Sequence, residues 1–228
     1  MFKMSKIWYL SPSNQAVNLG VSNYGSEKEQ MNLLLDEIIP HLDRAGVSFH
    51  RADADLSLES RVKESNEMGA VFHLALHSNA GGNGKARGPV AYYYSERGKI
   101  FAEQMIQFLL VLGQENNRWS NVLQEKSFYE LRKTTAPACL LEVDFHDSAS
   151  GVEFMISRRS QIAEAIAKAI IVADGREFVP VTTGEYLDEM IRMGFFQKDE
   201  DWNSPITKEE AAICMAKLIE TIRKGVIV

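Results

Sequence analysis

The chain alternates between short apolar runs and longer stretches in which apolar residues recur every three or four positions. The runs predict buried strands, and the recurring spacing predicts helices that bury one face. We expect strands at residues 7–10, 47–50, 70–76, 90–94 and 138–145, and a short extended segment at 128–131. We expect helices at residues 27–45, 56–68, 101–112 and 158–173. This alternation predicts an α/β domain with a central, mainly parallel sheet flanked by helices.

The pattern changes after about residue 175, which divides the chain into a main domain at 1–175 and a tail at 176–228. The tail begins with a linker and continues with two predicted helices, the second opened by a capping box of Thr207 and Glu210. A helical hairpin of this size buries little apolar surface on its own. We therefore expect it to pack on the main domain, to form a homo-oligomer or to bind a partner.

Charge and hydropathy exclude two classes of partner. The chain has 25 Lys and Arg against 31 Asp and Glu, a net charge of −6, which argues against nucleic acid. It contains no run of about 18 apolar residues, so no transmembrane helix is predicted. The first ten residues lack an apolar signal segment with a cleavage site. We expect a cytoplasmic protein that makes no membrane contact.

Three predicted strands end with polar segments, which lie at Ser11–Gln15, at His77–Ala80 and at Glu142–Asp147. The carboxyl ends of parallel strands lie at one edge of a sheet, where sites in α/β proteins gather. A His, a Glu at a helix start and a Glu inside a buried strand are a pattern typical of metal-assisted hydrolysis.

Two carboxylates each have a structural and a functional interpretation. Glu142 interrupts an apolar strand, where a carboxylate is costly unless it is paired or neutralised. It is either one half of an ion pair or a general base with a shifted pKa. Glu27 lies in the first turn of a predicted helix, where the helix dipole favours a carboxylate in any case.

The histidines differ in their positions along the predicted strands. A lone His after a strand is more often structural than catalytic, but His77 lies at the polar exit of its strand and precedes a Gly-rich loop that could admit a ligand, and both features favour a functional role. His73 lies four residues earlier, about 13 Å away by strand rise, so the two cannot bind one metal. We interpret His73 as a core residue. His146 follows Glu142 closely enough to contact substrate or orient a carboxylate.

Together these segments resemble the zinc-dependent N-acetylmuramoyl-L-alanine amidases of the amidase 3 type, over about residues 5–173. The His-Ser-Asn-Ala and Glu-Val-x-Phe stretches are fairly specific in combination. The matching stretches are Tyr9–Ser13, Glu27–Asn32, Leu74–Ala80, Arg87–Gly88, Tyr92–Tyr94, Tyr129–Arg132, Ala136–Ala138 and Leu141–Asp147.

The resemblance implies one zinc ion, held by a His after the first strand, a Glu at the first helix and the His of His-Ser-Asn-Ala. It also implies a Glu base on a later strand. Carried over, His77 and Glu27 are zinc ligands, with Glu29 as the alternative to Glu27, and Glu142 is the base. We assign Asn79 and Arg132, within the matching stretches, to substrate binding.

The first motif departs from the family pattern. The family has Asp-Pro-Gly-His-Gly after the first strand, whereas this chain has Ser-Pro-Ser-Asn-Gln at residues 11–15. Position matching gives Asn14 as the third ligand, but Gln15 has the longer reach and is our assignment. An amide oxygen is a weaker zinc ligand than imidazole. A non-catalytic wall-binding relative and a zinc peptidase acting on the stem peptide are therefore the alternatives to an amidase.

The resemblance also implies peptidoglycan as the partner. The tail resembles part of a surface-layer-homology repeat at Met193–Phe195 and Ser204–Ala211. A catalytic domain with a short tail and no predicted signal peptide resembles a phage or prophage endolysin. Such an enzyme stays in the cytoplasm until it is released and then acts on the cell wall.

Overall fold

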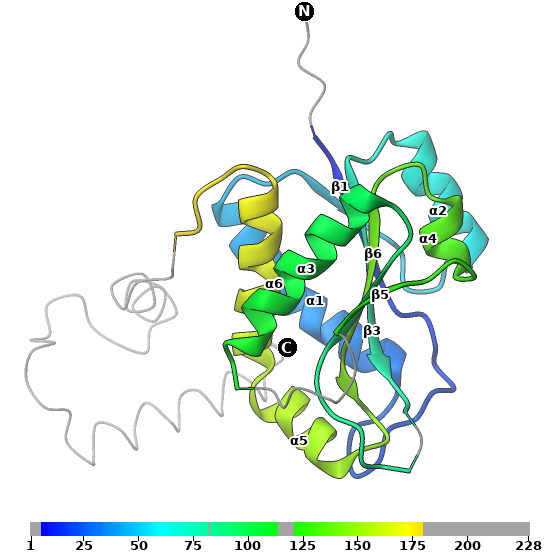
Figure 1. The fold of residues 1–228 in the computed structure, drawn as a ribbon, viewed down its shortest axis with the longest axis vertical. Helices are drawn as coiled ribbons and strands as arrows, with labels where there is room; N and C mark the ends of the chain where they lie inside the picture. The colour runs from blue at the N-terminus through cyan, green and yellow to red at the C-terminus, as the bar shows by residue number, and fades with distance from the viewer. Residues whose placement is uncertain (1–5, 82, 114–120, 180–228) are drawn as a thin grey trace, which may run out of the picture. The chain divides into compact units, whose positions relative to one another are not determined.

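The computed structural model describes residues 6–81, 83–113 and 121–179, so the predicted helical hairpin lies outside the described residues. Within them, six strands form one sheet in the order β2-β1-β3-β6-β4-β5 (Figure 1). The strands are β1 (Trp8–Pro12), β2 (Phe49–Arg51), β3 (Phe72–Asn79), β4 (Val90–Tyr93), β5 (Val122–Gln124) and β6 (Ala138–Phe145).

The sheet is mostly parallel, as the sequence predicts. Parallel pairing joins β1 to β2, β1 to β3 and β3 to β6. Strands β4 and β5 are parallel to each other, but β4 runs antiparallel to β6. The carboxyl ends of β1, β3 and β6 therefore lie at the same edge of the sheet.

Helices cover both faces of the sheet (Figure 1). Three long helices pack together on one face, and two short ones pack together on the other. The remaining helix, α5, follows β6 after a turn of three residues. The helices are α1 (Glu27–Arg44), α2 (Leu58–Glu67), α3 (Glu96–Leu110), α4 (Tyr129–Lys133), α5 (Ala149–Ser157) and α6 (Arg159–Ala173).

The two faces of the sheet differ in size and polarity. Trp8, Leu10 and Leu74 join the main core with α1, α3 and α6, because alternate residues of a strand face opposite sides. The opposite face holds a smaller apolar cluster that includes Ala75 and Leu140. Further along the same two strands this face carries polar side chains, so the site begins where the small cluster ends.

Helix α1 begins and ends where the sequence predicts. The Ser26 side chain accepts a hydrogen bond from the Glu29 backbone N–H, at 3.2 Å, and caps the first turn. The helix ends at Arg44, and Gly46 follows with φ +67°, a conformation that glycine adopts without strain. This capping fixes Glu27 as the first residue of the helix, with consequences for the site.

Two local predictions are wrong. The segment predicted as extended at 128–131 belongs to α4, a five-residue helix too short to show helical periodicity. Strand β3 continues to Asn79, whereas the predicted strand stops at residue 76. His77 therefore lies inside the strand and not in a loop after it, because pairing with β6 continues through His77 up to an irregularity before Asn79.

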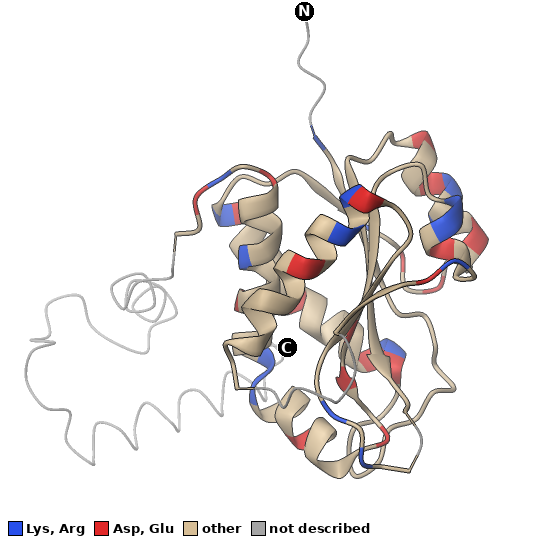
Figure 2. Cartoon of the chain, viewed as in Figure 1, with Lys and Arg blue, Asp and Glu red and all other residues tan. Residues whose placement is uncertain are grey.

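Charged residues lie mainly on the helices and connecting loops, with both signs interspersed (Figure 2). Among the described residues, no helix is long and apolar enough to cross a membrane. The main compact unit reaches Phe178, and the boundary at residue 175 stays a prediction.

A substitution at Gly98 of α3 tests how closely this helix packs on β6. A Cβ at this position would lie 2.5 Å from the Ala138 carbonyl oxygen. Replacing glycine by alanine inside a helix ordinarily gains up to about 1 kcal/mol, but overpacking a close contact costs about 1–3 kcal/mol. We expect Gly98→Ala to lower the free energy of unfolding in urea. The exposed Gln107→Ala on the same helix is the control, and a stabilised Gly98→Ala protein would contradict the close packing.

Candidate functional site

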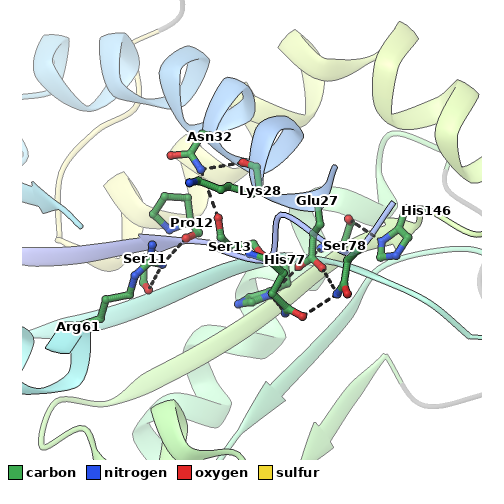
Figure 3. A network of polar contacts seen from close by, with 12 residues as sticks. Ser11, Pro12, Ser13, Glu27, Lys28, Asn32, Arg61, His77, Ser78 and His146 are labelled. Atoms are coloured by element: carbon green, nitrogen blue, oxygen red, sulfur yellow. Dashed lines mark hydrogen bonds and ion pairs between the residues drawn. The ribbon is translucent and has the colours of Figure 1, made fainter. Parts of the chain in front are cut away.

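The polar segments that follow β1, β3 and β6 meet at the carboxyl edge of the sheet. His77 of β3 and Glu142 of β6 are register partners, so their side chains leave the same face of the sheet as neighbours. Asn79, the last residue of β3, lies two positions further along that face. The start of α1 brings Glu27 to the same edge (Figure 3).

Glu27 and His77 form the closest polar contact of the site. The Oε1 atom of Glu27 lies 2.7 Å from the Nδ1 atom of His77 (Figure 3). The other oxygen, Oε2, accepts a hydrogen bond of 2.8 Å from Asn18, and the Ser78 backbone N–H donates to Oε1 at 3.4 Å. Burial would raise the pKa of Glu27, but the hydrogen bond and charge of His77 lower it below its usual value. The carboxylate is therefore held ionised.

The structure separates the two candidates for the third ligand. The Gln15 amide nitrogen lies 3.3 Å from His77 Nδ1, and its oxygen accepts from Asn18 at 2.6 Å. Asn14 instead donates to the Leu56 carbonyl, at 2.8 Å, in the loop before α2. Gln15 thus lies against the site, and the Asn14 side chain is engaged elsewhere.

A buried arginine holds the loop that carries Gln15. Arg61 of α2 donates to the Pro12 carbonyl, and to the Ser11 hydroxyl at 3.2 Å (Figure 3). The Ser13 hydroxyl accepts from the Gln15 backbone N–H at 3.2 Å. The Ser-Pro-Ser segment is therefore anchored on one side by α2, and this fixes where Gln15 leaves the strand.

Glu142 of β6 supplies the second carboxyl group at this edge of the sheet. Its Oε2 atom is buried and has no hydrogen-bond partner among the described residues. Burial raises the pKa of this carboxyl to about 7, although the charge of His77 opposes the shift. A group with this pKa can accept or release a proton near neutral pH.

The donor set fits a zinc ion only if an amide contributes. Imidazole nitrogen and carboxylate oxygen are ordinary zinc ligands, and His77 and Glu27 supply one of each at the same point. The described residues contain no group of three or more His, Cys, Asp or Glu side chains that could hold a metal. Half a turn of the Gln15 amide would exchange its nitrogen and oxygen and present the oxygen to His77.

Comparison with known proteins identifies the chain. The model of the Amidase_3 family, described as N-acetylmuramoyl-L-alanine amidase, matches residues 18–172, more than half of the chain. The chain belongs to the Amidase_3 family. The match begins just after the divergent Ser-Pro-Ser-Asn-Gln segment.

Relatives of this Amidase_3 chain agree with the assignment. It is 26% identical over 169 residues to the N-acetylmuramoyl-L-alanine amidase CwlM of Bacillus licheniformis, covering 70% of this chain and 64% of that protein's length. The fold is similar to that of the catalytic domain of CwlV from Bacillus (Paenibacillus) polymyxa var. colistinus. The TM-score is 0.68 at 21% identity, covering 75% of this chain and 99% of the other. AmiC2 of Nostoc punctiforme gives 0.65 at 22% identity, with 75% and 98% covered.

The other residues that the sequence predicts for the Amidase_3 site lie outside the contact between Glu27 and His77. Arg132 is exposed on α4, and its role in substrate binding stays a prediction. Glu29 is exposed, whereas Glu27 is buried, which favours Glu27 as the ligand. His146 is buried, with Nδ1 2.9 Å from the Ser78 hydroxyl, and so lies behind the strand that carries His77 (Figure 3).

The sequence pattern missed Asn18 and Ser78. Asn18 contacts both Gln15 and Glu27, yet it lies in a loop rich in Asn, Gly and Ser, where one amide does not stand out. Ser78 receives a hydrogen bond of 2.8 Å from Tyr24 and supports Glu27 through its backbone. Only its place in the His-Ser-Asn-Ala stretch could have indicated it.

A second buried pair lies beneath the site and is fully partnered. His73 is 0% exposed, which confirms it as a core residue. Its Nε2 atom lies 2.7 Å from Glu130 of α4, and its Nδ1 atom lies 3.0 Å from the Ser65 hydroxyl of α2. These contacts tie both short helices to β3, so we assign this pair to stability.

The raised pKa of Glu142 predicts a stability cost above neutral pH. The folded protein keeps the proton up to about pH 7, whereas the unfolded chain loses it near the ordinary glutamate pKa of 4.5, so stability falls as pH rises through this window. We expect Glu142→Gln to stabilise the metal-free protein by about 1–3 kcal/mol more at pH 8 than at pH 4.5. Urea unfolding at both pH values measures this. The exposed Glu153→Gln is the control, and equal effects at the two pH values would contradict the shift.

Proposed function

We propose that this protein hydrolyses the amide bond between the N-acetylmuramoyl residue and the L-alanine of peptidoglycan. The observation that carries the proposal is the Glu142 carboxyl group next to the Glu27–His77 pair, with a pKa of about 7 and an Oε2 atom that no described residue hydrogen-bonds. Membership of the Amidase_3 family supports the reaction class. The substrate follows from the names of the relatives, with CwlM among them.

We propose that His77, Glu27 and Gln15 would hold a zinc ion. When bound, zinc would polarise the scissile carbonyl and lower the pKa of a water molecule. Asn18 and the Ser78 backbone hold the Glu27 carboxylate in place, so that its orientation does not depend on the metal. His77 must be unprotonated to act as a ligand. Its pKa is raised, because the contact with Glu27 outweighs the effect of burial, so metal binding competes with a proton.

Glu142 performs the proton transfers in this proposal. Its carboxylate takes the proton from the attacking water as the oxygen forms its bond to the lactyl carbonyl carbon. It then delivers that proton to the nitrogen of L-alanine as the C–N bond breaks. A pKa near 7 serves both steps, because the group is partly ionised at neutral pH and is still acidic enough to protonate an amine leaving group.

One observation favours a second function. Gln15 stands where the family has a His, and an amide is a poor zinc ligand, so a wall-binding protein without activity would carry the same residues. Under either proposal the protein acts on the cell wall after release from the cytoplasm. The tail lies outside the described residues, so its role in wall binding or oligomer formation stays a prediction. An endolysin origin stays a prediction as well.

Replacing the base tests the catalytic proposal. We expect Glu142→Gln to retain the fold and to lower the rate of amino-group release from purified peptidoglycan by about 10²–10⁴-fold, the usual loss for a general base. Glu153→Gln, the same change at an exposed position of α5, is the control and should stay near the wild-type rate. A Glu142→Gln rate above half that of wild type would remove Glu142 from the mechanism.

Replacing the amides tests the ligand assignment. Because Gln15 faces His77 and Asn14 does not, we expect Gln15→His to tighten zinc binding by at least about tenfold, or 1.4 kcal/mol. Asn14→His should leave zinc affinity unchanged. Competition with a chromophoric chelator measures both affinities in the absence of substrate. Tighter binding in Asn14→His alone would show that position matching, and not the observed contact, identifies the ligand.

A further inference from the structure

A hollow of about 220 Å³ adjoins the site on the side of β4. Its wall includes Asn79 at the end of β3, Val90 and Tyr92 of β4, Leu123 of β5 and Phe145 of β6. Gly81 and Ala86, from the connection between β3 and β4, complete the wall. Most of the lining lies on strands, which hold the geometry of a binding site better than loops do.

Register places this hollow beside the reacting groups. Val90 is the antiparallel partner of Glu142, so the two side chains leave the same face of the sheet. Tyr92 lies two residues further along β4, again on that face, and its side chain is hydrogen-bonded to Asn79. A substrate whose scissile bond lies at Glu142 and His77 can therefore extend one of its two halves over the hollow.

The lining of the hollow is apolar, with a few polar groups. Tyr92 and Phe145 supply aromatic rings, and Val90 and Leu123 supply aliphatic surface. The Asn79 amide and the Tyr92 hydroxyl are the hydrogen-bonding side-chain groups on its wall. No described residue that lines it carries a charge, and the carboxyl group of Glu142 lies beside it, opposite Val90 in the β4–β6 pairing.

This chemistry distinguishes the two halves of the proposed substrate. The stem peptide carries free carboxylates, which would meet no cationic side chain among the described residues on the wall of the hollow. The glycan half is uncharged while its lactyl group is held in the amide bond. A sugar ring also offers an apolar C–H face to the two aromatic rings, and its acetamido group matches an amide and a hydroxyl.

We propose that this hollow binds the glycan side of the substrate, as a subsite for the N-acetylated sugar that bears the scissile lactyl amide. The inference rests on the proposed amidase function and extends it by orienting the substrate across the sheet. The glycan lies over β4 and β5, and the stem peptide leaves over β1 and the start of α1. The volume suits a single sugar ring, since it lies below the usual range for drug-sized ligands.

Filling the hollow tests the assignment. Two soluble substrates are compared, a disaccharide-peptide and a D-lactyl-peptide that lacks the sugar. We expect wild-type protein to prefer the disaccharide-peptide by about tenfold or more in kcat/KM, the scale of lost contacts in an apolar pocket. Leu123→Trp should remove most of that preference through KM and leave cleavage of the lactyl-peptide unchanged. Val111→Trp, at a position 84% exposed at the end of α3, is the matched control and should behave as wild type.

A more conservative variant provides a second test in case the Leu123→Trp protein does not fold. Tyr92→Phe keeps the ring and removes the hydroxyl, and it should raise KM for the disaccharide-peptide only. If Leu123→Trp and Tyr92→Phe slow both substrates equally, the hollow does not bind the sugar and the assignment is overturned.

A binding measurement separates this inference from the proposed reaction. If wild-type protein cleaves neither substrate, the amidase proposal fails, and binding of the neutral sugar N,N′-diacetylchitobiose is measured by NMR titration at millimolar concentration. Shifts at the hollow that disappear in Leu123→Trp would support the subsite without activity. No binding to wild-type protein would overturn it.

Discussion

The contact between Glu27 and His77 is the constraint on which the site depends. It joins the first turn of α1 to β3 across the carboxyl edge of the sheet, at 2.7 Å between a carboxylate oxygen and an imidazole nitrogen. The Ser26 cap determines that Glu27 is the first residue of the helix, and the pairing of β3 with β6 determines that His77 lies next to Glu142. Three separate pieces of secondary structure thus supply one polar cluster.

Two carboxyl groups in this protein illustrate how a hydrogen-bonding partner changes the effect of burial. Burial acts on both Glu130 and Glu142 by favouring the protonated form. At Glu130 the hydrogen bond and charge of His73 outweigh burial and lower the pKa, and breaking such a pair costs about 3–5 kcal/mol. At Glu142 no hydrogen bond within the described residues satisfies Oε2, so the pKa rises to about 7. A stable fold does not require that arrangement, which supports the proposed role of Glu142 in proton transfer.

The sequence predicts the long elements and the three segments that meet, because apolar periodicity and buried runs are local signals. It does not predict α4 or β5, which are too short to show a period, nor the continuation of β3 through His77. Nor can it choose between the adjacent amides of Asn14 and Gln15, since the choice depends on one hydrogen bond from Asn14 to the Leu56 carbonyl, 42 positions away. The hollow beside Glu142 is likewise invisible in the sequence, because strands far apart along the chain build its wall.

The most direct test of the account is the chemistry of the bond that is cut. Purified peptidoglycan is digested with zinc-loaded protein, and the new termini are identified by mass spectrometry. The account predicts free L-alanine amino termini together with muramoyl residues that carry a free lactyl carboxylate. New reducing sugar ends, or amino termini at any other residue of the stem peptide, would contradict it.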